Sequence, residues 1–230
     1  MSGSSGEAQS PDHAIARSNR SLLPYCVVLA GPLEFPKTGV QGAAVHSASS
    51  AGLTVLYSVL PSRRLSPDAL PRAALEFWEL IRRTLEQRAV IPFRFPTWVN
   101  KTELQEHLKQ HRESYAMFLR QFADYVQLDI RVTPRDTADI AQVPATGTDY
   151  MMRLRKWKRW VSSLPGTFEQ ITRIKPRSWH HREEGKVLRL FALVERSSAA
   201  EFSERLTEFC DLADANIRVS GPWPATEFLP

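Results

Sequence analysis

The sequence predicts an α+β protein of two domains, of which the C-terminal one has the β-α-β-β-α-β order of a ferredoxin-like, split βαβ fold. A length of 230 residues suits one large domain or two small ones, and a hydrophobic fraction of 43% is sufficient for packed cores. After Tyr125 the spacing of apolar residues changes from helical to alternating, which marks the domain boundary. We therefore expect a disordered, Ser/Gly-rich tail over residues 1–20, an N-terminal α+β domain with two long helices over 21–125, and the ferredoxin-like domain with a Gly-Pro-Trp-Pro tail over 126–230.

Three strands and one helix are predicted for the first hundred residues. Apolar, β-branched runs predict strands at residues 25–30 and 53–60. A Ser-Pro-Asp segment at 66–68 supplies a cap and a proline for the first turn of a helix. Residues 90–95 form a third strand, which Pro92 places at a sheet edge or a bulge because proline has no backbone donor. The apolar stripe of the helix has helical spacing: Leu70, Ala74, Phe77, Ile81 and Leu85.

A second long helix is predicted to begin after Asn100. Glu103 lies three residues later and completes a capping box with it. Beyond Tyr125, apolar residues alternate with polar ones over 126–133, which predicts a half-buried strand. The expected buried stripe of the helix is Leu104, Leu108, Tyr115, Phe118 (or Leu119) and Phe122.

The remaining elements of the C-terminal half are predicted from the residues that begin or end helices and from the spacing of apolar residues. Pro165 and Gly166 are expected to end a helix, because proline removes a backbone donor and glycine favours a stop. The expected elements are a helix at 148–164, strands at 168–174 and 186–195, a charged turn at 176–185 between them, a helix behind a capping box at 198–201, and a strand at 216–220.

The net charge of +5 is concentrated in one band of the chain. Residues 153–189 hold eleven Lys and Arg residues against three Glu residues, whereas the rest of the chain is mildly acidic. Leu154, Trp157 and Val161 recur at helical spacing, so we expect them to face the core while the cations around them face solvent. A basic surface of this kind can bind a nucleic acid, an anionic membrane or an acidic protein face, and charge alone does not choose among them. The predicted partner-binding residues of this basic segment (residues 153–159) are Arg153, Arg155, Lys156, Lys158 and Arg159.

The sequence contains no recognisable catalytic or cofactor motif. It has no Gly-rich phosphate-binding loop, no G-x-S-x-G nucleophile motif and no C-x-x-C pair. Glu103, His107 and His111 share one helix face, and a solvated polar face is favoured over a metal site because no second helix supplies a partner ligand. His180 and His181 are expected in a surface turn, with side chains that point apart. We therefore predict a non-enzyme without a metal or a cofactor.

Compartment and redox state are predicted from what the chain lacks. No uninterrupted apolar run reaches the roughly 18 residues of a membrane span, and residues 1–20 have no apolar signal region. We therefore expect a cytoplasmic protein without a membrane span. Cys26 and Cys210 are expected to be buried free thiols.

Two segments rich in aromatic residues and proline resemble those of a known family. Residues 90–99 are V-I-P-F-R-F-P-T-W-V, and residues 220–229 are S-G-P-W-P-A-T-E-F-L. Together they resemble the gas vesicle protein L/F family (GvpL/GvpF), whose members carry a V-L-P-x-R-F-G-T segment and end in G-P-W-P-P-Y-x-F. Pro96 in place of Gly, and Ala225-Thr226-Glu227 in place of Pro-Tyr-x, indicate a divergent member. The residues that carry the resemblance are Pro92, Arg94, Phe95, Gly221, Pro222, Trp223 and Pro224.

The resemblance implies a non-catalytic accessory protein of gas vesicle formation, located with gas vesicles in the cytoplasm. Its implied partners are the small apolar shell protein and other accessory proteins, and the basic segment or an exposed sheet edge could contact them. Trp223 either folds back over the sheet or the domain junction, or stands exposed as a binding hot spot. The alternative function is a ferredoxin-like RNA-binding module that uses residues 153–159. The sequence lacks the sheet-borne aromatic pattern of such modules, which disfavours nucleic acid as a partner.

Overall fold

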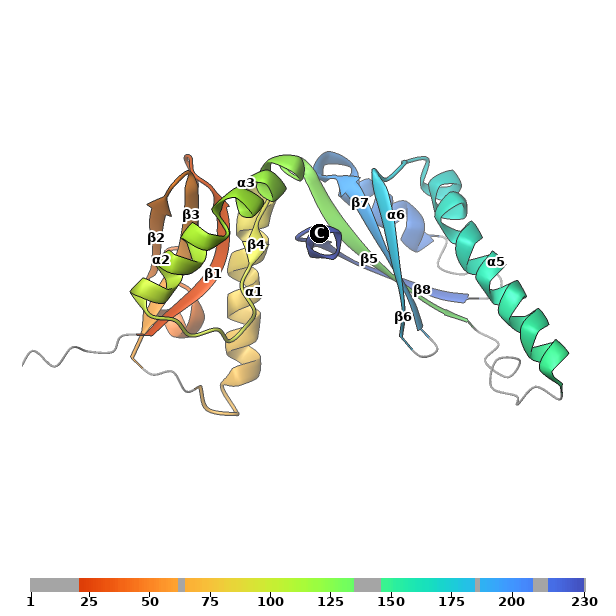
Figure 1. Cartoon of the computed structure of the whole chain (residues 1–230), viewed down its shortest axis with the longest axis horizontal. Coiled ribbons are helices and arrows are strands. Elements are labelled where there is room, and N and C mark those ends of the chain that lie inside the picture. Colours follow the sequence, from red (N-terminus) through yellow and green to blue (C-terminus); the bar gives the residue numbers. More distant parts are fainter. Residues whose placement is uncertain (1–20, 62–64, 135–145, 185–186, 209–214, 230) are drawn as a thin grey trace, which may run out of the picture.

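The computed structural model describes residues 21–61, 65–134, 146–184, 187–208 and 215–229. In these ranges the chain forms two four-stranded antiparallel sheets with helices packed against them (Figure 1). The predicted α+β class is confirmed. The expected tail over residues 1–20 and Cys210 lie outside the described residues.

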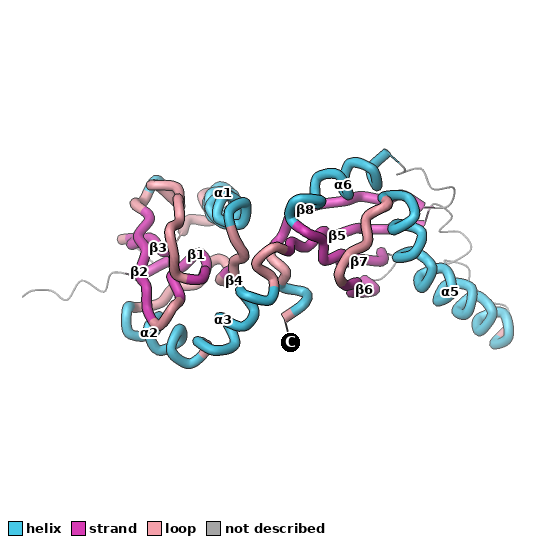
Figure 2. Tube along the Cα trace, turned by 90° about the horizontal axis from the view of Figure 1, so that it is seen from above, coloured by secondary structure: helices cyan, strands magenta, loops and turns pink. Residues whose placement is uncertain are grey.

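Helices cover the N-terminal sheet on both faces. The sheet has the order β2-β3-β1-β4, with β1 at Ser21–Leu29, β2 at Val45–Ser50, β3 at Leu53–Leu60 and β4 at Ile91–Pro92. Helix α1 (Leu70–Gln87) lies on one side, and α2 (Lys101–Gln110) and α3 (Arg112–Gln121) lie on the other (Figure 2). Eight of the nine β1 residues are buried, as expected for a central strand between two helical layers.

Pro92 lies in the edge strand β4, as predicted. β4 is the last strand in the sheet order and pairs with β1 through Cys26 and Val27. One side of an edge strand forms no hydrogen bonds with a neighbouring strand, so the missing N–H of proline breaks no hydrogen bond there. The missed strand is β2, whose residues after Val45 are all exposed and show no hydrophobic alternation.

The second long helix expected in this half is two helices instead. The Asn100 capping box is confirmed: its side-chain oxygen accepts from the Glu103 N–H at 2.9 Å, and the Glu103 carboxylate accepts from the Asn100 N–H at 2.7 Å. His111, with φ −99° and ψ 9°, leaves helical geometry and separates α2 from α3. The bend lets both short helices lay their apolar residues on the same sheet face, including Leu104, Leu108, Phe118 and Leu119.

Helix α1 begins at Leu70, slightly later than predicted. The Ser66 side chain and carbonyl accept hydrogen bonds from Ala69 and Leu70 in a turn that precedes the helix. Phe77, Ile81 and Leu85 are buried as expected, whereas Leu70 is exposed.

The C-terminal half has the element order β-α-β-β-α-β. Its sheet has the order β6-β7-β5-β8 and every strand pair is antiparallel. Helices α5 and α6 pack on one face of this sheet, and the last residues of the chain lie on the other side (Figure 2). The elements are β5 (Tyr125–Pro134), α5 (Gly147–Thr172), β6 (Ser178–Glu184), β7 (Val187–Glu195), α6 (Ala199–Glu208) and β8 (Ala215–Trp223), with short 3-10 turns at Arg196–Ser198 and Thr226–Phe228.

Helix α5 continues through Pro165, so the predicted stop and the strand at 168–174 are wrong. Leu164 and Phe168 are buried against the sheet, and the buried Thr172 donates its hydroxyl to the Phe168 carbonyl at 2.7 Å. A proline inside a helix costs about 3 kcal/mol, and burial of two large apolar side chains offsets this. The expected charged turn at 176–185 is also wrong, because residues Ser178–Glu184 form edge strand β6.

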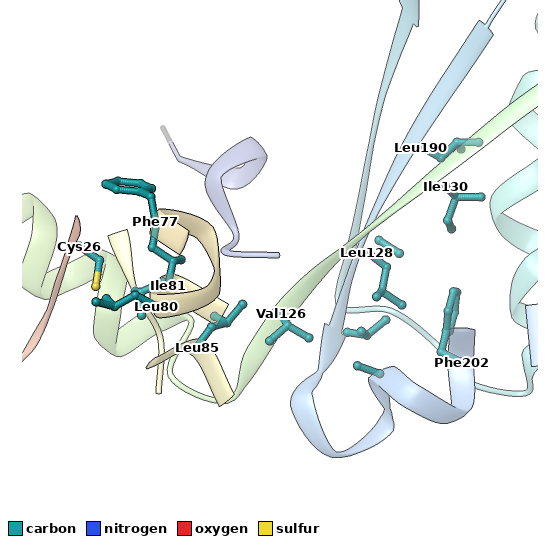
Figure 3. Packing of buried hydrophobic residues seen from close by; sticks show 14 of the residues in the cluster. Cys26, Phe77, Leu80, Ile81, Leu85, Val126, Leu128, Ile130, Leu190 and Phe202 are labelled. Carbon is teal, nitrogen blue, oxygen red and sulfur yellow. The ribbon is translucent and has the colours of Figure 1, made fainter. Parts of the chain in front are cut away.

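One hydrophobic core joins the two halves. It contains buried residues of both sheets, and Figure 3 shows Leu85 of α1 beside Val126 at the start of β5. Arg196 adds polar contacts at the same place, since its guanidinium donates to the carbonyls of Leu85 and Ala123. The cation at the C-terminal end of α1 also has a favourable interaction with the helix dipole.

Candidate functional site

The basic segment forms an exposed cationic surface on α5. Arg155, Lys156, Lys158 and Arg159 are exposed, and the structure shows no ion pair to any of them within the described residues. The side chains of Arg153 and Leu154 are outside the described residues.

The expected rotation of this helix is confirmed by the residues between the cations. Val161 is buried, and Trp157 is half-buried with its ring 5.0 Å from that of Trp160. Both tryptophan rings pack against the main core. Trp157 therefore contributes to the fold, and the cations around it remain available to solvent.

Trp223 packs at the junction of the two halves. Its ring centroid lies 4.4 Å from that of Trp78 on α1, and its indole N–H donates to the Ser220 hydroxyl at 3.3 Å. The expectation that Trp223 folds back onto a helix or sheet surface is confirmed, although the side chain is only half-buried. Part of the ring is therefore still accessible to a partner.

Gly221 allows the C-terminal segment to approach the sheet closely. Its φ is +135°, and a Cβ at this position would lie 2.9 Å from Leu128 Cδ2 and 3.0 Å from the Gln127 carbonyl oxygen. The pairing of β5 with β8 shifts register here, and the Gly221–Pro222 peptide bond is cis. Only glycine fits both the backbone angle and the space. After the exposed Pro222, Pro224 is buried.

The other motif segment also packs on α1. Phe95 is half-buried with its ring 4.9 Å from that of Phe77, the neighbour of Trp78 in sequence. Arg94 is exposed, and the Phe95–Pro96 peptide bond is cis. Two segments that are more than a hundred residues apart thus contact adjacent positions of one helix, which gives their residues a structural role at the junction.

His107 of α2 and His111 at its C-terminal end belong to an aromatic cluster. The prediction of a solvated polar face is therefore wrong. The His107 and His111 rings are 4.6 Å apart, and His107 Nε2 is 2.8 Å from the Tyr115 hydroxyl. Burial lowers the pKa of His107, and the nearby His111 lowers it further. The Glu103 carboxylate is engaged in the capping box. Within the part of the chain that the structure describes, no three His, Cys, Asp or Glu side chains group as metal ligands.

Of two other expectations from the sequence, the turn at His180 and His181 is wrong and the burial of Cys26 is confirmed. His180 and His181 lie in strand β6 and not in a turn, so their side chains point to opposite faces of the sheet. Cys26 is fully buried as expected, and burial raises the pKa of its thiol to about 12. That thiol stays protonated at neutral pH and is a poor nucleophile.

The sequence analysis missed a line of cations on the open face of the C-terminal sheet, the face away from α5 and α6. Arg182 of β6 is paired with Arg189 of β7. Arg131 of β5 is paired with Arg189 on one side and with Arg218 of β8 on the other. We call these four residues the arginine row. Each arginine lies on a different strand, so only the register of the ladders brings them together. The alternation of the strands was a weak sign that they would share a face.

None of the helices in the described ranges is long and apolar enough to cross a membrane.

Comparisons with known proteins agree on one family. The model of the family described as gas vesicle synthesis protein GvpL/GvpF matches residues 22–230. The structure is similar to the crystal structure of the gas vesicle protein GvpF from Anabaena sp., with a TM-score of 0.67 and 13% sequence identity over 92% of this chain and 96% of that one. It is also similar to GvpF from Microcystis aeruginosa, with a TM-score of 0.68 and 13% identity over 91% of this chain and 99% of that one. A comparison with curated protein sequences found no match.

Proposed function

Because this chain belongs to the gas vesicle GvpL/GvpF family, we propose that it is a non-catalytic, cytoplasmic accessory protein of gas vesicle formation that binds the vesicle shell protein and other accessory proteins during assembly. The single observation that carries this proposal is the family match over residues 22–230. The shared fold with two GvpF proteins supports it over nearly the whole chain.

The proposal treats the two halves as domains with different tasks. The strand order β6-β7-β5-β8 with helices on one face supports our assignment of the C-terminal half as a ferredoxin-like, split βαβ domain, and we treat the N-terminal half as a smaller α+β domain. The continuous core and the Trp78–Trp223 contact would hold the two domains in one orientation. A rigid body of this kind suits a protein that positions a partner, because less entropy is lost on binding.

We assign the partner contact first to the basic segment on α5. Its four described cations are exposed and have no counter-ion within the described residues, so an acidic surface of a partner would gain attraction without breaking an existing pair. The accessible part of Trp223 is the second assigned contact, because tryptophan often dominates interface energetics. The family residues Pro92, Phe95, Gly221 and Pro224 support the junction.

A pull-down with purified shell protein tests the assignment. Lys156→Glu with Arg159→Glu should weaken capture of the shell protein, because two attractive charges become repulsive, while stability changes by less than about 1 kcal/mol. Wild-type capture should also weaken as salt rises, since exposed charges are screened beyond about 8–10 Å at physiological salt.

The matched control is Lys101→Glu with Lys109→Glu on α2, which makes the same charge change on another exposed surface. Equal capture by both double variants would remove the basic segment from the mechanism. A gel shift with random RNA tests the alternative function as an RNA-binding module. Tight binding of RNA that is lost in the α5 variant would favour a nucleic-acid partner.

A further inference from the structure

We propose that the open face of the C-terminal sheet is a docking site for an extended, acidic protein segment, which the arginine row holds through its carboxylates. The proposal does not depend on gas vesicle assembly and uses a surface separate from the basic segment. It rests on the alignment of the four arginines, on the lack of an ion pair at Arg218 within the described residues, and on a segment of the chain itself whose Glu227 already contacts this face.

The geometry of the row follows from strand register. Directly paired residues of antiparallel strands share a face, so the pairs Arg182–Arg189, Arg189–Arg131 and Arg131–Arg218 place all four side chains on one side of the sheet. Neighbouring strands are about 4.8 Å apart, so the row spans about 14 Å perpendicular to the strands. Carboxylates on alternate residues of an extended chain are about 6.6–7 Å apart, so about three of them can meet the row.

The two ends of the row differ in their ion pairs. Asp129, which is almost fully buried, binds Arg189 and lies 3.9 Å from Arg131. Glu227 binds Arg182 at 2.7 Å. Arg218 is exposed, and within the described residues it forms no ion pair.

Like charges on directly paired residues destabilise a sheet. Asp129 is shared between Arg131 and Arg189, and Arg218 has no ion pair in the described ranges, so the end formed by Arg131 and Arg218 retains an excess of positive charge. An added anion would stabilise that end. Arginine suits carboxylates in particular, because its planar fork can donate two parallel hydrogen bonds to one carboxylate.

The C-terminal segment of the chain shows how an acidic segment sits on this face. The Glu227 backbone N–H donates to the Gln127 side chain at 3.0 Å, and Ala225 and Phe228 pack in the same apolar cluster as Leu193 of β7. The Glu227 side chain then meets the Arg182 end of the row. A partner segment with alternating carboxylates would meet the Arg131 and Arg218 end, which this internal segment does not neutralise.

Single-stranded RNA fits this face less well than an acidic peptide. Sheet-binding RNA modules stack bases on exposed aromatic rings of their central strands. On the central strands here, the aromatic residues of the open face are Phe191, which is only 1% exposed, and Tyr125, which is half-buried. The Phe191 ring is flanked by Arg189 and Arg182, at 5.1 Å and 5.9 Å. The Arg177 guanidinium lies 4.8 Å from the centre of the Tyr125 ring, so neither ring is free for bases to stack on.

Fluorescence anisotropy with a labelled short peptide of alternating Glu and Ser tests the proposal. The wild-type protein should bind this peptide and not the matched peptide with Gln in place of Glu. Arg131→Gln with Arg218→Gln should weaken binding by about tenfold or more, because two charge-assisted contacts are lost. The matched control, Lys101→Gln with Lys109→Gln on α2, loses the same charge on another exposed surface and should bind like the wild type.

Three results would overturn the proposal. The first is equal affinity for the Glu and Gln peptides. The second is equal weakening by the row variant and the α2 variant, which would indicate a nonspecific charge effect. The third is tighter binding of a labelled oligouridylate than of the Glu peptide, with that binding lost in the row variant. Thermal melts of both variants exclude misfolding, and shell capture measured in parallel separates a failure here from a failure of the proposed function.

Discussion

The two sheets of this protein contain the same number of strands, but helices cover both faces of the first sheet and only one face of the second. In the N-terminal sheet, β1 is buried almost throughout, with Val28 facing one cluster of apolar side chains and Val27 facing the other. In the C-terminal sheet, β5 alternates between apolar residues under the helices and Gln127, Asp129 and Arg131 on the open face.

The difference in coverage gives the two sheets different roles: the N-terminal sheet contributes mainly to stability, and the C-terminal sheet also presents a surface. A sheet between two helical layers gains stability from both faces but offers little surface to a partner. A sheet with one open face keeps its core on the other side and can carry charge without harming the fold. The proposed docking site lies on the open face for this reason, and the four predictions below test the contrast from the largest expected effect to the smallest.

A buried charge on the covered sheet should have the largest effect. Val27→Asp places a carboxylate in a fully buried position of β1 and should cost about 3–5 kcal/mol or prevent folding, because Val27 lies in a cluster of apolar side chains. Arg131→Gln on the open sheet face should cost less than about 1 kcal/mol. Urea unfolding of both variants measures the contrast, and similar losses would show that the second sheet is as closed as the first.

The contact between the halves should have the next largest effect. Trp223→Ala should cost about 1–3 kcal/mol, less than a fully buried tryptophan, because the side chain is half-buried. A double-mutant cycle with Trp78→Ala should show coupling of about 0.5–1.5 kcal/mol between the two rings. Additive losses would mean that the rings do not stabilise each other. Unchanged stability with lost partner binding would instead make Trp223 a binding hot spot.

Gly221 tests how tightly the C-terminal segment lies on the second sheet. Gly221→Ala should cost at least about 1 kcal/mol, because the backbone angle disfavours a side chain and the new Cβ would contact Leu128 at 2.9 Å. Gly52→Ala is the control, since Gly52 also has a positive φ but open space around its Cβ position. Thermal melts should show the larger loss at Gly221. An equal loss at both positions would leave only the backbone angle as the cause.

His107 tests the second helical layer of the first sheet and should have the smallest effect. Its folded-state pKa lies below the ordinary histidine value of 6.5, so the unfolded chain takes up a proton first as the pH falls. The stability contributed by neutral His107 is therefore present above about pH 6.5 and is lost as the pH drops below it. His107→Gln should reduce this loss between about pH 7 and 5.5. Urea titrations at each pH measure it, and identical slopes for the variant and the wild type would contradict the assignment.

Features that depend on neighbouring residues were predictable from the sequence. The capping box of Asn100 and Glu103 is a contact over three residues, and both of its hydrogen bonds form. The edge position of Pro92 follows from a missing donor, and the rotation of the basic segment follows from the spacing of Trp157 and Val161. The family resemblance was likewise carried by two short segments, and the family match over residues 22–230 agrees with it.

Tertiary structure decided whatever depends on residues that are distant in sequence. Local chemistry predicted a helix stop at Pro165, but burial of Leu164 and Phe168 on a sheet formed elsewhere outweighs the lost hydrogen bond. The polar strand β6 forms because its backbone pairs with that of β7 through antiparallel hydrogen bonds. The arginine row is the clearest case, because its four members become neighbours only through the register of three strand pairs. Register is set by the packing of the opposite face, where the alternating apolar residues of each strand must meet the same core.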